Sequence, residues 1–106
     1  MRATFQGVLA AGLLLALANP GARAADLADG KALAEKWCSH CHLTGPGQKR
    51  AGDAAPTFTS IARMPSTTEM SLKAFLQTPH VRMPDYQLTR AEIDDLTAYI
   101  LSLRSH

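Results

Sequence analysis

The chain has few of the residues on which disulfide-rich or strongly charged proteins depend. Among its 106 residues there are two cysteines and six aromatic side chains, and the formal net charge is +2. A disulfide scaffold uses more cysteines at wider spacings, so that class of protein is excluded. The near-balanced charge argues against nucleic acid as the main partner. The length allows one small domain and excludes a multidomain enzyme.

No apolar run is long enough to cross a membrane, which takes about 20 apolar residues. The longest run covers residues 8–17, after Arg2 and before the breaker Asn19-Pro20-Gly21 and the small-residue stretch Ala22-Arg23-Ala24. A charged start, an apolar middle and an A-x-A site are typical of a secretory signal peptide. We expect residues 1–24 to be such a peptide, cleaved after Ala24, and residues 25–106 to be the mature domain; an uncleaved anchor is the alternative.

Cleavage there leaves a small domain with a weak core of its own. It removes Arg2 and Arg23 from eleven basic residues, which leaves as many basic as acidic side chains. Few large rings remain in the mature part, and a domain of this size usually needs a disulfide, a metal or another covalent constraint. We therefore expect a bound group to supply part of the apolar core.

The spacing of apolar residues predicts helices and no strand. A helix is predicted over residues 26–37, with Asp26 as its N-cap. A second, short helix is predicted within residues 56–63. A third helix is expected over 66–77, opened by a capping box from Ser66 to Glu69. Its apolar side would consist of Met70, Phe75 and Leu76.

The last helix has the clearest pattern. A second capping box runs from Thr89 to Glu92, and five apolar residues then recur at helical spacing: Ile93, Leu96, Tyr99, Ile100 and Leu103. Residues 44–55 and 80–88 are expected to be loops. The predicted fold is all-α, with three to four helices whose long loops wrap around a bound group.

The pentapeptide Cys38-Ser39-His40-Cys41-His42 indicates which group that is. It is a C-x-x-C-H sequence, the attachment signature of c-type haem. Two thiols at this spacing reach the two vinyl groups of one porphyrin and form thioether bonds. His42 then supplies its imidazole to the iron. The flat apolar ring also provides the missing core volume.

The cysteine pair has three other interpretations. A zinc site needs two further ligands, for which only histidines such as His40, His80 and His106 are available, because no second cysteine pair exists. A thioredoxin-like redox pair needs a βαβ setting, which the helical pattern lacks. A structural disulfide across C-x-x-C is the third. The complete pentapeptide after an export signal favours haem.

The mature chain resembles the class I c-type cytochromes, small single-haem electron carriers. The resemblance covers residues 26–105 and rests on Gly30, the C-x-x-C-H motif, Pro56, Met83-Pro84, and a last helix with Leu96 and Tyr99. It implies that the first and last helices cross, with Gly30 packed against Tyr99. It also implies one covalently attached haem c and no enzymatic activity.

The resemblance further implies the remaining contacts of the iron. Cytochromes of this family use a His and a Met ligand, and Met83 stands in the matching loop; Met64, which also precedes a proline, and His80 are the alternatives. The Pro56 carbonyl would accept the second ring N–H of His42 and orient it. Many relatives have Gly-Pro-x-Leu where this chain has Ala55-Pro56-Thr57-Phe58, so the local packing is expected to differ.

The expected function is outer-sphere electron transfer by a monomeric periplasmic shuttle between redox-protein partners, some of them membrane complexes. The alternative is a non-dissociating haem subunit of a larger oxidoreductase. A gas sensor or peroxidase with an open iron position is a third possibility, against which Met83 counts. Four basic residues, Lys49, Arg50, Lys73 and Arg82, either ring the haem edge and steer an acidic partner or form an ordinary solvated surface.

Overall fold

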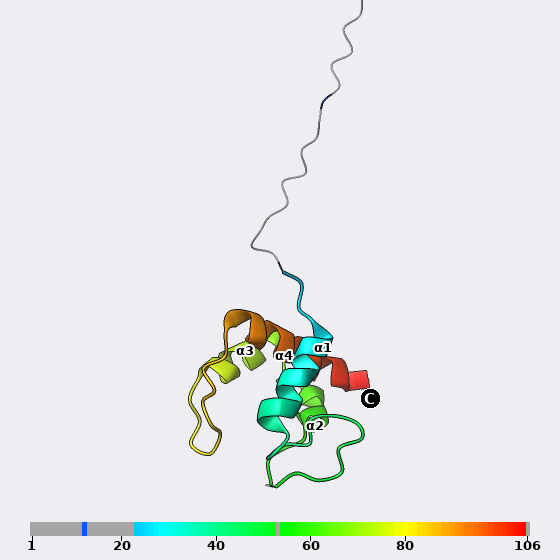
Figure 1. Ribbon diagram of the computed structural model, residues 1–106, viewed down its shortest axis with the longest axis vertical. Coiled ribbons are helices and arrows are strands. Elements are labelled where there is room, and N and C mark those ends of the chain that lie inside the picture. Colours follow the sequence, from blue (N-terminus) through cyan, green and yellow to red (C-terminus); the bar gives the residue numbers. More distant parts are fainter. Residues whose placement is uncertain (1–11, 13–22, 53, 106) are drawn as a thin grey trace, which may run out of the picture.

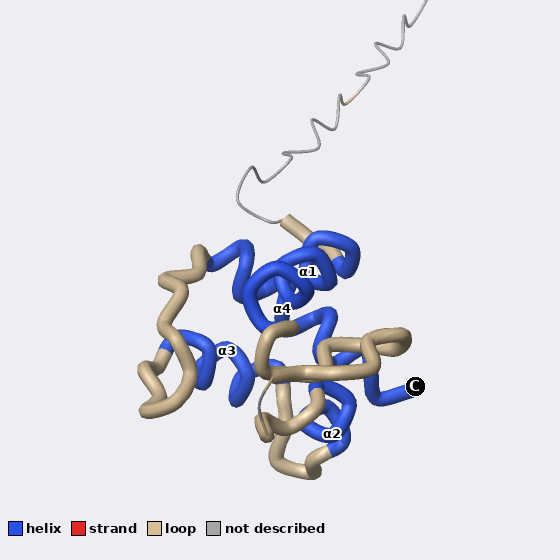
Figure 2. Tube along the Cα trace, turned by 60° about the horizontal axis from the view of Figure 1, so that its bottom comes forward, coloured by secondary structure: helices blue, strands red, loops and turns tan. Residues whose placement is uncertain are grey.

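The computed structural model describes residue 12 and residues 23–52 and 54–105, so most of the expected signal peptide lies outside the described residues. The elements are α1 (Leu27–Leu33), a π-helical turn η1 (Ala34–Cys38), α2 (Phe58–Arg63), α3 (Glu69–Gln77), α4 (Arg90–Ser102) and a 3-10 turn η2 (Leu103–Ser105). Strands are absent from this part of the chain, which confirms the all-α prediction (Figure 1 and Figure 2). None of its helices is long and apolar enough to span a membrane.

Helices α1 and α4 cross at a position where only a glycine fits (Figure 1). A Cβ atom on Gly30 would overlap the backbone carbonyl of Asp95 and would lie 2.8 Å from the Cβ of Tyr99. Such contacts are shorter than van der Waals separation, so any side chain at this position would force the two helices apart. The crossing of the first and last helices, with Gly30 against Tyr99, is confirmed.

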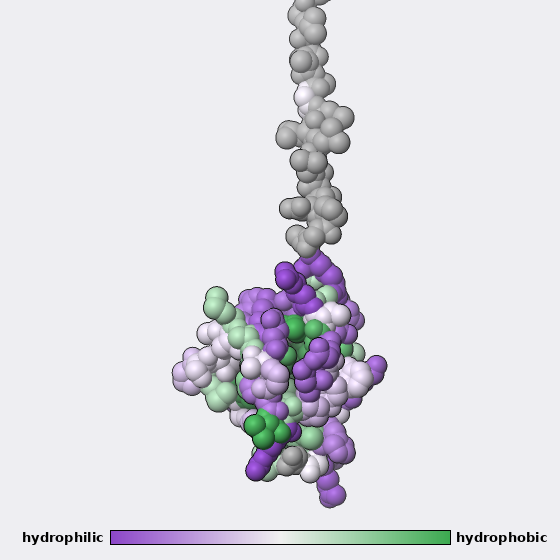
Figure 3. Space-filling view, turned by 90° about the vertical axis from the view of Figure 1, so that its left-hand side faces the viewer, coloured by the Kyte–Doolittle hydropathy of each residue, from purple (hydrophilic) through white to green (hydrophobic). Residues whose placement is uncertain are grey.

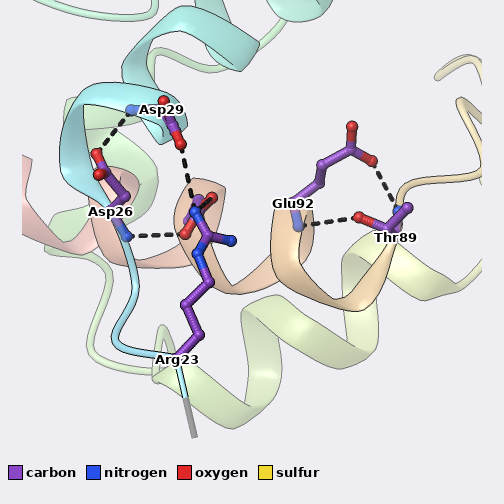
Figure 4. Close-up of polar contacts among 6 residues, drawn as sticks. Arg23, Asp26, Asp29, Thr89 and Glu92 are labelled. Atoms are coloured by element: carbon purple, nitrogen blue, oxygen red, sulfur yellow. Dashed lines mark hydrogen bonds and ion pairs between the residues drawn. The ribbon is translucent and has the colours of Figure 1, made fainter. Parts of the chain in front are cut away.

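A buried carboxylate fastens the start of α1 to α4 beside this crossing. Asp95 is 3% exposed and accepts the backbone N–H of Asp26 at 2.8 Å and the guanidinium of Arg23 at 3.0 Å. Figure 4 shows Arg23 also reaching Asp29, at 3.3 Å, and Asp26 accepting the N–H of Asp29 at 3.0 Å as the predicted N-cap. Each carboxylate oxygen of Asp95 therefore has a donor from the residues around the start of α1.

One predicted capping box is confirmed and the other is wrong. Thr89 and Glu92 exchange both hydrogen bonds at the start of α4 (Figure 4). The box that opens α3 is formed by Thr68 and Ser71, not by Ser66 and Glu69. The reason is that a turn closed by the N–H of Thr67 on the Met64 carbonyl occupies the residues before Thr68, so the helix begins later.

The side of α3 that faces the core differs from the predicted apolar side. Leu72 is buried, and Leu76 packs against the core one turn further on. Met70 is 81% exposed, so the prediction that it belongs to the apolar side of this helix is wrong. Contact with α4, rather than the intrinsic pattern of α3, selects the buried face.

The hydrophobic core follows α4 along its length. Its buried members are Ala34, Cys38, Phe58, Ala62, Leu72, Leu96, Tyr99, Ile100 and Leu103. Cys38 is the one member that belongs to the C-x-x-C-H motif. The core therefore extends directly to the motif. Long loops run beside α2 and α3 (Figure 2).

Candidate functional site

Two adjoining cavities lie between the C-x-x-C-H motif, α2, α3 and the loop that follows α3. Their volumes are about 550 Å³ and about 390 Å³. Six residues line both: Cys38, His42, Pro56, Ile61, Phe75 and Met83. Shared walls make the two cavities parts of one cleft, each within the size range of pockets for small molecules and cofactors.

The local backbone places the motif on one wall of this cleft. The π-helical turn η1 ends at Cys38, and Ser39 closes it by donating to the Ala34 carbonyl at 3.0 Å. A tight turn follows, in which the N–H groups of Cys41 and His42 both donate hydrogen bonds to the Cys38 carbonyl, at 3.2 and 2.9 Å. Single π-turns inside helices occur frequently at functional sites. Cys38, at the end of this turn, and Cys41 and His42, which follow it, all line the larger cavity.

Neither cysteine is part of a disulfide, and the two differ in their surroundings. Cys38 is buried, and this burial, with a smaller contribution from the charge of Cys41, raises the pKa of its thiol to about 11. Before haem is attached, the Cys38 thiol is therefore neutral near pH 7 and lies against an apolar wall. Cys41 is half-buried and lines only the larger cavity.

The imidazole of His42 is oriented by a loop carbonyl. Its Nδ1 lies 2.6 Å from the Pro56 oxygen. Because a carbonyl only accepts, Nδ1 carries the proton, and Nε2 is left with a free lone pair for a metal. The ring of Phe58 lies beside the imidazole, with 5.3 Å between centroids. This aromatic neighbour occurs where the family pattern Gly-Pro-x-Leu has a leucine.

Met83 shares both cavities with His42. An isolated bridge between His80 and Met83 closes a tight turn, and Met83 is half-buried. Met64 lines only the smaller cavity and is 47% exposed.

His80 is held by other contacts. Its Nε2–H donates to the Phe75 carbonyl at 3.1 Å, and its ring stacks on Phe75 with 3.7 Å between centroids. His80 lines only the larger cavity, whereas Met83 lines both.

The lining of the cleft fits a porphyrin and does not fit a metal ion alone. In the part of the chain that the structure describes, no acidic side chain lines either cavity. In that same part, no group of three or more His, Cys, Asp or Glu residues lies together in a way that could hold a metal ion. Both facts count against zinc. Two thiols, one imidazole and one thioether around an apolar slot are the groups that haem c requires.

Basic residues at the cleft mouth differ from the expected set. Of the four candidates only Arg82 lines the cavity, and it is joined there by Lys36, which sequence reasoning missed. Lys73 instead forms ion pairs with Glu69 at 2.6 Å and with Asp94 at 3.0 Å. Arg50 lines a separate groove. Nothing in the sequence indicates that Lys36, in η1, faces the cleft.

Apolar side chains are exposed around the same mouth. Val81, at the tip of the turn that carries Met83, is fully exposed, and Phe75 is 46% exposed. Trp37 and Tyr86 line the larger cavity and contact each other, with 4.9 Å between ring centroids. Figure 3 shows the side of the molecule that carries α3 and this loop, where hydrophobic side chains lie in small groups among hydrophilic ones.

Comparison with known proteins agrees with this arrangement. A family model described as cytochrome c oxidase, cbb3-type, subunit III matches residues 25–100. Cytochrome c-552 of Bradyrhizobium diazoefficiens is 42% identical over 92 residues, which cover 87% of this chain and 88% of that protein. No solved structure matches the chain.

Proposed function

The chain belongs to this family of small class I c-type cytochromes, which carry haem c and transfer electrons, and we propose that it is an exported shuttle whose iron is bound by His42 and Met83. The observation that carries the proposal is the cleft itself. His42 and Met83 line both of its cavities, and the two thiols line the same wall as His42. The bound haem supplies an Fe(II)/Fe(III) couple to this site.

Each residue of the cleft has a separate task in this proposal. Cys38 and Cys41 hold the ring by thioether bonds. Pro56 fixes the ring of His42 and increases its basicity through the 2.6 Å hydrogen bond. Met83 supplies a thioether ligand, which raises the reduction potential relative to a second histidine. Two ligands that stay bound in both oxidation states keep the structural change on electron transfer small.

The mouth of the cleft suits an acidic redox partner. Lys36 and Arg82 are the charged side chains among the described lining residues apart from histidines, and no carboxylate faces them there. Positive charge at the mouth increases the rate of encounter with an acidic surface, and salt weakens the effect. The exposed side chains of Val81, Trp37 and Tyr86 add apolar area for a short-lived contact.

Export of the chain completes the proposal. Residues 1–24 have the order of a secretory signal, and the domain at residues 25–106 begins where the family model begins to match. We therefore place the mature domain in the periplasm. We propose that the protein works as a monomer, binds its partners only transiently and catalyses no reaction of its own.

A second candidate is a permanent haem subunit of an oxidase. The matching family is described as a subunit of such a complex, which favours this function. The relative, of which this chain covers 88%, is named cytochrome c-552 and not a subunit of an oxidase, and this name favours the shuttle. Purification of the native chain separates the two candidates, because constant co-elution with an oxidase or dehydrogenase would refute the shuttle.

Optical spectra of methionine variants test the proposed ligation. The oxidised wild-type protein should show the weak red absorption band of an iron–thioether bond. Met83→Ala should abolish this band, whereas Met64→Ala, the matched control, should retain it. Loss of the band in Met64→Ala together with its retention in Met83→Ala would refute Met83 as the ligand.

A further inference from the structure

Both polar groups of the Gln48 side chain, its Nε2 and its Oε1, form hydrogen bonds to the loop that contains the C-x-x-C-H motif. Its Nε2 lies 2.8 Å from the Ser39 carbonyl, 2.9 Å from the His42 carbonyl and 3.0 Å from the Arg50 carbonyl. Its Oε1 accepts from the backbone N–H and the hydroxyl of Thr44, both at 2.9 Å. An amide has two N–H groups, so three acceptors share two donors.

These contacts complete the fixation of His42. The backbone N–H of His42 donates to the Cys38 carbonyl, and its ring donates to the Pro56 carbonyl at 2.6 Å. The carbonyl of His42 accepts from Gln48. Gln48 also holds the Ser39 carbonyl, which lies between the two cysteines in the chain. The amide therefore fixes the backbone on both sides of Cys41.

The same amide connects the motif to the crossing of α1 and α4. Thr44, which Gln48 binds through Oε1, is 2% exposed, and its carbonyl accepts the hydroxyl of Tyr99 at 2.7 Å. Tyr99 packs against Gly30 at the crossing. The backbone turns at Gly47, whose φ of +93° favours glycine, immediately before Gln48. A continuous set of hydrogen bonds thus runs from the helix crossing to the proximal histidine.

We propose that Gln48 is a positioning residue for the iron ligand: it holds the carbonyls of Ser39 and His42 so that the imidazole keeps one orientation toward the haem. This inference rests on the proposed ligation by His42. It assigns to one side chain outside the motif a task comparable to that of the Pro56 carbonyl. Groups that orient a metal ligand typically change metal affinity or activity by about 10-fold or more when they are removed.

Two variants and one control test the inference in the exported, haem-loaded protein. Gln48→Met keeps the length of the side chain and removes all five hydrogen bonds. Gln48→Glu keeps an oxygen for Thr44 and removes only the donors to the carbonyls. Gln77→Met makes the same chemical change at an exposed position at the end of α3. The readout is the proton NMR spectrum of the ferric protein, in which the iron shifts the resonances of its ligands.

Both Gln48 variants should displace the resonances of the ring of His42, and Gln48→Met, which loses all five hydrogen bonds, should displace them at least as far as Gln48→Glu. Gln77→Met should have the wild-type spectrum. Wild-type histidine resonances in both Gln48 variants, with only a lower unfolding midpoint, would overturn the inference. A wild-type spectrum without histidine-ligand resonances would instead refute the proposed ligation by His42, so the two failures are distinguishable.

Discussion

Removal of the haem should unfold the domain. We consider the chain with Cys38 and Cys41 both replaced by serine, which has no thiol for the proposed thioether bonds. The cleft would then contain no group to fill it. The smaller cavity alone has a volume of about 390 Å³ and is lined by core residues that include Leu72, Leu96 and Ile100.

The size of this cavity sets the magnitude of the effect. Cavities enclosed in protein cores cost about 24 cal/mol per Å³, so a space of about 390 Å³ costs at most about 9 kcal/mol, because this cleft is open to solvent on one side. The total stability of a small domain is about 5 to 15 kcal/mol. The loss is therefore comparable to the whole free energy of unfolding, and the haem-free chain should have no stable folded state.

Urea unfolding followed by far-UV circular dichroism measures this directly. The wild-type protein should unfold in one cooperative transition, and the double serine variant should show weak helical signal and no cooperative transition. Met83→Ala is the control, because it removes one proposed ligand and keeps the covalent attachment. A haem-free variant that unfolds cooperatively with wild-type helix content would refute the argument.

Three further predictions concern the crossing of α1 and α4. Gly30→Ala should destabilise the protein by about 1 to 3 kcal/mol, measured by urea unfolding, because its Cβ would overlap the Asp95 carbonyl; an unchanged midpoint would contradict the close packing. In the mature domain, Asp95→Ala should cost about 2 kcal/mol through the lost hydrogen bond between its carboxylate and the Asp26 N–H. The exposed Asp29→Ala is the control, and an equal loss of stability in both variants would contradict this prediction. Tyr99→Phe should lose about 1 kcal/mol with its bond to Thr44. Burial, and secondarily the charge of Glu35, raises the pKa of Tyr99. Its stabilisation is therefore complete below the usual tyrosine pKa and is lost as the pH rises through the raised value. Tyr99→Phe should lack this alkaline loss, and identical pH profiles would refute it.

Local sequence patterns predicted the elements whose stability is local. The capping box from Thr89 to Glu92 lies directly before a strong apolar repeat, so its position was fixed by neighbouring residues alone. Ser66 and Glu69 have the same spacing, yet the turn from Met64 to Thr67 moves the start of α3. That turn depends on tertiary packing, which the spacing of residues does not contain.

In the candidate site, too, contiguous residues were predictable from the sequence, and contacts made only in the folded chain were not. The C-x-x-C-H motif predicted the haem group because its five residues are contiguous. Met64 and Met83 both precede a proline, so sequence alone left both open, and only the fold shows that Met83 shares both cavities with His42. Gln48 gave no signal, because its five contacts reach residues that only the folded loop brings together.

The mass of the exported chain tests the central claim most directly. Electrospray mass spectrometry of the purified protein under denaturing conditions removes any group that is not covalently bound. The account predicts the mass of residues 25–106 increased by one haem, with the added mass on the peptide that contains Cys38 and Cys41. A mass equal to the polypeptide alone would contradict it.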